Sequence, residues 1–263
     1  MTAMKTDPCV AEMADVETSS DDYARRFSGA VGGWMLSVQE RLTLDLLAAA
    51  PGVRRVLDVG GGHGQLAGAL CREGYAVTVV GSAASCGHRI SNLVEDNRCK
   101  FEVANLLSLP YPEDAFDAVL SFRLLTHCEH WPVLVRELCR VAATAVIVDY
   151  PSSHSLNVVA PFLFRAKKRV EKNTRPWRSF HPADIRSTFE RHGFKQRHCR
   201  KQFFLPMVVH RMLRRRTVSR TAEGLCRALA LTRFWGSPVI VEMRRDSTES
   251  ESGGRRPEVP KRA

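Results

Sequence analysis

A strand, a glycine turn and a helix follow one another between Arg55 and Leu70, in the sequence RVLDVGGGHGQLAGAL. The β-branched and apolar residues 56–59 predict a buried strand, and the residues from Gln65 to Cys71 predict a helix. Glycines between the two elements let a ligand approach the backbone, and the first turn of a helix offers free N–H donors. The stretch therefore predicts an open α/β sheet that binds a nucleotide-like cofactor at this turn.

The glycines fit two different cofactors. Residues 62–67 satisfy G-x-G-x-x-G/A, the pattern of a dinucleotide turn for NAD(P). Residues 58–64 also fill D-x-G-x-G-x-G, in which the carboxylate of Asp58 could orient an ammonium group but would repel a pyrophosphate. That spacing resembles the first motif of class I S-adenosylmethionine-dependent methyltransferases. The resemblance implies that Asp58 lies beside the ammonium group and that the turn lies beneath the methionine moiety, through Gly60, Gly61, Gly62 and Gly64.

Strands and helices alternate through the rest of the chain. Such alternation predicts a doubly wound, mostly parallel α/β sheet of seven strands with helices on both faces. The expected strands are 56–59, 76–80, 100–104, 116–122, 144–149, 194–205 and 238–243. The expected helices between them are 65–73, 85–96, 131–141 and 181–191.

The two ends and one insertion complete this organisation. An apolar pattern over residues 21–50 predicts a helical cover that precedes the first strand. Residues 206–234 predict one or two basic helices inserted before the last strand. The polar segments 1–20 and 246–263 are expected to be disordered tails, which leaves residues 21–245 as a single Rossmann-like domain.

A second group of motifs lies between Phe101 and Pro151, in FEVANLLSLPYPEDAFDAVLSFRLLTHCEHWPVLVRELCRVAATAVIVDYP. Its L-P-aromatic loop, F-D-x-V-x-S strand, following histidine, L-x-E-x-x-R-V helix and apolar strand ending in Asp149 occur in an order similar to that of the same methyltransferase family. The resemblance covers roughly residues 23–151, and more weakly the chain up to Met243. It implies further cofactor contacts at Gly81 and Ser82 beside the ribose and adenine, at Asn105 and Leu106 on the adenine, and at Ser121, Phe122 and Arg123 beneath the sulfonium.

One position departs from the family pattern. Members usually carry Asp or Glu after the second strand, where the carboxylate accepts hydrogen bonds from the ribose hydroxyls, but this chain has Gly81. Three explanations stay open: a weaker affinity for S-adenosylmethionine, a degenerate non-catalytic member of the fold that acts as a binding protein, or another cofactor. NADP is the candidate for the last case, in an NADP-binding reductase, because Arg89 lies close in sequence.

Two side chains at the ends of strands are candidates for the chemistry. His127 follows the fourth strand, and a histidine can act as a general base at neutral pH. Tyr150 ends the fifth strand at the same edge and is expected to face the substrate. No spacing of His, Cys or carboxylates predicts a metal site. We expect methylation of a small, apolar molecule, at oxygen first and at carbon second.

Charge and cysteine content indicate which partners and which cellular compartment we expect. The net charge is +11, and none of the basic runs belongs to a recognisable nucleic-acid-binding module. The basic segment 207–220, which interleaves arginines with apolar residues, is expected to contact an anionic membrane from one side. No run of about 18 apolar residues or secretory signal is visible, and the eight cysteines contain no C-x-x-C pair, so we expect a cytoplasmic protein with reduced thiols.

Overall fold

A computed structural model describes residues 12–50, 52–156 and 178–246. Seven strands form one sheet in the order β3-β2-β1-β4-β5-β7-β6, and β7 runs antiparallel to its neighbours β5 and β6. The strands are β1 (Arg55–Val59), β2 (Ala76–Gly81), β3 (Cys99–Val103), β4 (Phe116–Ser121), β5 (Ala142–Tyr150), β6 (Phe194–Phe203) and β7 (Ser237–Arg245). The predicted doubly wound, mostly parallel sheet of seven strands is confirmed.

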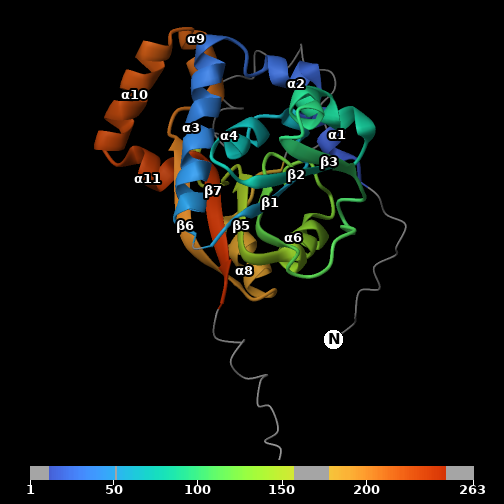
Figure 1. The fold of residues 1–263 in the computed structure, drawn as a ribbon. Helices are drawn as coiled ribbons and strands as arrows, with labels where there is room; N and C mark the ends of the chain where they lie inside the picture. Colours follow the sequence, from blue (N-terminus) through green and yellow to red (C-terminus); the bar gives the residue numbers. More distant parts are fainter. Residues whose placement is uncertain (1–11, 51, 157–177, 247–263) are drawn as a thin grey trace, which may run out of the picture.

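Helices cover both faces of this sheet (Figure 1). On one face, α6 (Trp131–Val141) and α8 (Pro182–Glu190) pack on β4, β5 and β6 through residues such as Leu138 and Phe189, which are fully buried. On the other face lie α3 (Gly29–Ala48), α4 (Ala67–Arg72) and α5 (Ser91–Glu95), which contribute Leu47 and Leu70 to a second apolar core. Burial on both faces explains why the central strands read as nearly continuous apolar runs.

Several elements begin and end where the sequence predicts. Helix α6 spans the predicted residues 131–141, with Pro132 in its first turn, where the missing N–H costs nothing. Helix α8 begins at Pro182, and the ring of His181 accepts a hydrogen bond from the Ala183 amide as a cap. The predicted helix 85–96 is instead a 3₁₀ segment, η2 (Ala84–Ile90), followed by the short α5.

The N-terminal cover and the insertion are both helical. The cover consists of α2 (Asp21–Arg25) and α3, while the insertion contains three helices rather than one or two: α9 (Met207–Leu213), α10 (Arg216–Ala228) and α11 (Leu231–Trp235). Figure 1 places α10 at the outer edge of the molecule, beyond α3. No helix in the described ranges is long and apolar enough to cross a membrane.

The structure differs from expectation at the N-terminal tail. Residues 12–20 are described, and α1 (Ala14–Thr18) forms there instead of a disordered segment. Ala14, Asp15 and Thr18 are all buried. The rest of the expected N-terminal tail, residues 1–11, and residues 247–263 of the C-terminal one lie outside the described residues.

Candidate active site

The glycine turn follows β1 and contains the 3₁₀ segment η1 (Gly61–His63). Gly60 and Gly64 flank that segment with φ of 72° and 74°, a left-handed conformation that favours glycine. Gly62 has no room for a side chain, because a Cβ there would lie 2.3 Å from the backbone oxygen of Cys86. The turn therefore needs glycine for both its conformation and its packing.

Asp58 lies directly beneath this turn. Its side chain is 2% exposed, and its Oδ1 atom has no hydrogen-bond partner among the described residues. Burial raises the pKa of this carboxyl to about 7, against the opposing effect of the Arg123 guanidinium. A buried acid with an unused oxygen at a glycine turn fits a ligand that brings an ammonium group to the same place.

The turn after β2, where the family's usual acid is missing, carries a carboxylate from the N-terminal segment instead. Gly81 ends the strand, and a Cβ there would lie 2.7 Å from the Cβ of Cys86. The carboxylate of Asp15, from α1, accepts hydrogen bonds from the Ser82 amide (2.8 Å) and from the Ser82 hydroxyl. Asp15 is fully buried. Sequence analysis missed this residue, because a short acidic segment gives no signal of a long-range contact.

The remaining candidate cofactor residues lie at the ends of β3 and β4. Asn105 turns its side-chain oxygen back to the Leu107 amide (3.0 Å), and Leu106 is buried in the main core. Ser121 and Phe122 are buried at the end of β4. Because β3, β2, β1 and β4 are adjacent and parallel, all the predicted cofactor residues meet at one edge of the sheet.

A cavity of about 120 Å³ lies beside this edge. Its wall is largely apolar. Tyr23 of α2, Met35 of α3 and Phe27 of the turn between them line one part, and Phe203 and Met207, at the end of β6 and the start of α9, line another. Its polar residues are Gln39, Arg123, Thr126, His127, Asp149 and Gln202. An apolar cavity with a few converging polar groups is the usual form of a small-molecule site.

Three of these polar residues form one network. The Asp149 carboxylate accepts hydrogen bonds from the Arg123 amide (2.5 Å) and from the Gln39 side chain (2.9 Å), and the Arg123 guanidinium donates to the Gln39 oxygen (2.9 Å). Burial raises the pKa of Asp149, while the Arg123 amide opposes this effect. Arg123 has a φ of 62°, and its guanidinium lies over the Phe27 ring. A non-glycine residue held in the left-handed region is frequent at functional sites.

The structure separates the two predicted catalytic residues. His127 is half-buried and lines the cavity, and its ring centroid lies 6.3 Å from that of Tyr23 in an edge-to-face arrangement. Tyr150 is 2% exposed, packs against Phe180 in the core, and is not among the residues that line the cavity. Burial raises the pKa of the Tyr150 hydroxyl. His127 is therefore placed for contact with a small molecule, and Tyr150 is placed as a packing residue.

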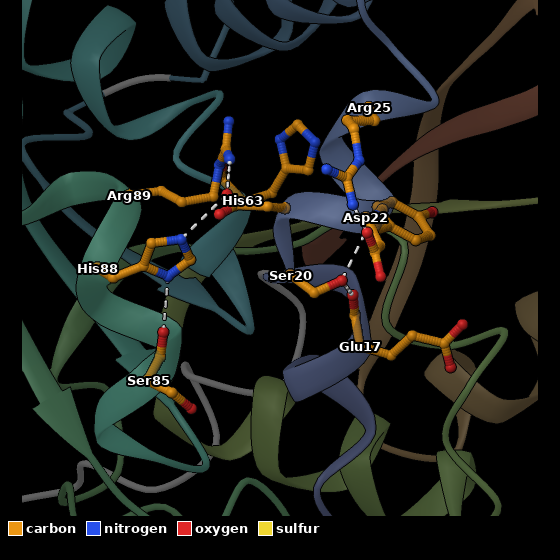
Figure 2. Close-up of polar contacts among 10 residues, drawn as sticks. Glu17, Ser20, Asp22, Arg25, His63, Ser85, His88 and Arg89 are labelled. Carbon is orange, nitrogen blue, oxygen red and sulfur yellow. Dashed lines mark hydrogen bonds and ion pairs between the residues drawn. The ribbon is translucent and has the colours of Figure 1, made fainter.

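The segment η2 joins the turn to the N-terminal helices. Figure 2 shows His88 and Arg89 of η2 facing the corner between α1 and α2, where Glu17 and Ser20 lie. Arg89 pairs with Asp21 (2.7 Å) and donates to the backbone oxygen of His63 (3.2 Å). Arg89, the residue considered for a bound NADP phosphate, is thus engaged with the protein itself. Burial lowers the pKa of His63 to about 3, so its ring is neutral in this cluster.

The sheet order, the glycine turn and the buried acid together define a class I methyltransferase-type α/β domain. A family model described as "Methyltransferase domain" matches residues 34–201 of the chain. The fold is similar to the crystal structure of magnesium protoporphyrin IX methyltransferase from Synechocystis PCC 6803 with bound S-adenosylhomocysteine. The TM-score is 0.59 at 17% identity, over 86% of this chain and 94% of that one.

Two curated relatives match in sequence over shorter stretches. Ajmaline N-methyltransferase of Rauvolfia serpentina is 31% identical over 91 residues, which cover 31% of this chain and 30% of that protein. Malonyl-[acyl-carrier protein] O-methyltransferase of Halorhodospira halophila is 34% identical over 133 residues, which cover 49% and 44%. The chain thus matches less than half the length of each of these relatives.

The chain belongs to the methyltransferase domain family, and it shares its fold with a methyltransferase whose crystal structure holds bound S-adenosylhomocysteine. This assignment favours the sulfur cofactor over NADP at the glycine turn. The residues present fit that cofactor, because the unused oxygen of Asp58 suits its ammonium group and the turn excludes side chains that would block its methionine part. No group of His, Cys, Asp and Glu in the described residues could hold a metal ion.

Proposed function

We propose that this chain transfers a methyl group from S-adenosylmethionine to an oxygen atom of a small, largely apolar molecule. The observation that carries this proposal is the largely apolar cavity at the ends of β4 and β5, which has His127 in its wall. When bound, the cofactor supplies an electrophilic methyl group. The protein then has to align the acceptor atom with that group and to remove the acceptor's proton.

His127 is our candidate for the proton acceptor. A ring nitrogen of neutral histidine would take the hydroxyl proton of the acceptor, whose oxygen would then displace S-adenosylhomocysteine from the methyl group that the bound cofactor supplies. The polar network of Gln39, Arg123 and Asp149 on the same cavity would orient the polar end of the acceptor. An activated carbon atom is the second choice of acceptor, because the same base could remove its proton.

The curated relatives support methyl transfer without choosing the acceptor atom. One carries an N-methyltransferase name and the other an O-methyltransferase name, so the matched region occurs with both. The competing hypothesis is a non-catalytic binding protein of the same fold. Gly81, which lacks the usual ribose carboxylate, is the feature that favours it.

Thermal unfolding tests the cofactor part of the proposal. The protein is heated with S-adenosylhomocysteine, S-adenosylmethionine and NADPH in parallel. A ligand at about 100 times its dissociation constant stabilises the folded state by about 2.7 kcal/mol, and the midpoint rises by at least roughly 5 °C. A rise with NADPH alone, or with none of the three, would contradict the proposal.

Transfer of label tests the chemistry. Methyl-labelled S-adenosylmethionine is incubated with a panel of apolar phenols and carboxylic acids, and the extracted organic phase is counted. His127→Gln should lower kcat about 10²- to 10⁴-fold on a hydroxyl acceptor and leave the dissociation constant of S-adenosylhomocysteine within about twofold. Equal turnover of the variant on a phenol would remove the histidine from the mechanism.

The helical insertion suggests where an apolar acceptor comes from, and we propose that it rests on an anionic membrane. Met212 and Val218 are 66% and 42% exposed, beside the exposed arginines of the segment 207–220, while Met207 of α9 lines the cavity. Binding to vesicles that contain anionic lipid should weaken sharply as salt rises, and vesicles without anionic lipid are the control. Salt-independent binding, or none, would refute this contact.

The cysteines in the described part of the chain have free thiols, which suits our expectation that the protein lies in the cytoplasm.

A further inference from the structure

Residues 12–19, here called the N-terminal strap, cross the edge of the sheet where the predicted cofactor residues meet. At one end, the Glu12 carboxylate accepts hydrogen bonds from the amides of Glu129 and His130 (2.7 Å each), in the loop after β4. In the middle, Asp15 binds Ser82 after β2. The strap thus joins two loops that flank the glycine turn on opposite sides.

The strap lies in van der Waals contact with the turn itself. A Cβ placed on Gly60 would be 3.4 Å from the Cβ of Asp15, and one placed on Gly62 would be 2.4 Å from the Ser19 hydroxyl. Asp15 is fully buried, and Thr18 and Ser19 are each 2% exposed. The side chains of Asp15 and Ser19 therefore fill the space beside Gly60 and Gly62, and another molecule does not fit between the strap and the turn.

Asp15 also occupies the space that an acid at position 81 would use. An ideal Cβ on Gly81 lies 3.3 Å from the Asp15 Oδ2 atom, which is close to where the carboxylate of a side chain at position 81 would be. That oxygen accepts the Ser82 amide hydrogen, and the other oxygen accepts the Ser82 hydroxyl hydrogen. The groups expected to lie beside the ribose and adenine are therefore already bonded to the protein's own carboxylate.

We infer that the strap occupies the cofactor site, both at the glycine turn and at the turn after β2, and competes with S-adenosylmethionine, so that the cofactor binds only when the strap leaves. This inference rests on the proposed function, since it names a control on the same site. Displacement is feasible because α1 has only five residues, too few to be stable as a helix by themselves. The apparent affinity for the cofactor is the intrinsic affinity multiplied by the fraction of molecules in which the strap has left.

Binding to strap variants tests the inference. Asp15→Ala removes the two bonds to Ser82 and should tighten S-adenosylhomocysteine binding about tenfold or more. It should tighten 5′-methylthioadenosine, which lacks the amino-acid part, by the same factor. Glu17→Ala is the matched control, because Glu17 lies on the same helix and only pairs loosely with Arg26 (3.9 Å). A protein that lacks residues 1–19 should behave like Asp15→Ala, which covers the case in which the point variant is unstable.

The opposite results are informative in different ways. An unchanged dissociation constant would overturn this inference alone. A weaker one would also overturn it and would make Asp15 a ligand of the ribose hydroxyls. If S-adenosylhomocysteine binds neither the full chain nor the shortened protein, the cofactor assignment falls as well, and the inference falls with it.

Hydrogen exchange on the unmodified chain gives a readout that needs no variant. Ser19 donates its amide hydrogen to the Asp15 backbone oxygen, and Val16 donates to Met13. Saturating S-adenosylhomocysteine should speed exchange at these strap amides while slowing exchange at the glycine turn. Slower exchange at both places would mean that the strap closes over the ligand instead of leaving, and would overturn the inference.

Discussion

Asp58 should make cofactor binding depend on pH in the neutral range. Burial raises the pKa of its carboxyl to about 7 in the free protein, and the ammonium group of S-adenosylhomocysteine pairs only with the ionised form. The ionised fraction falls from roughly nine-tenths at pH 8 to roughly one-tenth at pH 6. The dissociation constant should therefore rise about tenfold between these pH values, because only the ionised fraction is competent to bind.

Titration calorimetry at several pH values is the assay. Below pH 7 binding should be coupled to release of a proton from Asp58, so the measured enthalpy should change with the ionisation enthalpy of the buffer. Asp58→Asn should bind more weakly at pH 8 and show little pH dependence. His63 does not contribute to the pH dependence between pH 6 and pH 8, because burial lowers its pKa to about 3. A flat profile for the unmodified protein, or the same slope in the variant, would refute the reasoning.

The same residue should affect stability in the opposite direction. The folded-state pKa of Asp58 lies above its ordinary value of 3.8, so its stabilising contribution is complete below that value and is lost as pH rises toward about 7. With each unit of pKa equivalent to about 1.36 kcal/mol, the cost at pH 8 is at most on the order of 4 kcal/mol. Asp58→Asn should thus raise the thermal midpoint of the free protein at pH 8 while weakening the cofactor. A lower midpoint would contradict this argument.

Two further substitutions test the packing that positions the site. Gly62→Ala should lower the free energy of unfolding in urea by about 1–3 kcal/mol, because its Cβ would overlap a backbone oxygen. It should also abolish the cofactor-dependent midpoint shift. Gly33→Ala in α3, where the space is open, is the control and should not lower the free energy of unfolding. Glu223→Ala should cost about 2–5 kcal/mol, because this buried carboxylate accepts the amide hydrogens of residues 204–205 and contacts His210. A loss below about 0.5 kcal/mol in either case would contradict the packing argument.

The sheet and its helices were predictable because local patterns specify them. The apolar run of β5 and the amphipathic stripe of α6 arise from residues close together in the chain, and tertiary packing supports the same choice. The edge at which the candidate cofactor residues meet follows from parallel strands joined by crossovers. These features therefore needed no knowledge of long-range contacts.

The strap and the place of Gln39 in the polar network could not be predicted in this way. Residues 1–20 are polar and acidic, and helix α1 within them is held by contacts such as Asp15 to Ser82, which are 67 residues apart. Gln39 and Asp149 lie 110 residues apart, and Gln39 reads in the sequence as an ordinary polar position of a helix. Propensity cannot reveal such residues, because their structure comes from partners that only the folded chain brings near.

Tyr150 and His127 offer the clearest comparison between position in the sequence and position in the structure. Tyr150 ends β5 and His127 follows β4 at the same edge of the sheet, yet His127 lines the cavity and Tyr150 packs against Phe180 in the core. Tyr150→Phe should therefore leave kcat within about threefold, because phenylalanine keeps the ring that packs against Phe180. His127→Gln should lower kcat strongly and leave the urea midpoint nearly unchanged. A large loss of kcat in Tyr150→Phe, without a change in stability, would instead return the tyrosine hydroxyl to the reaction.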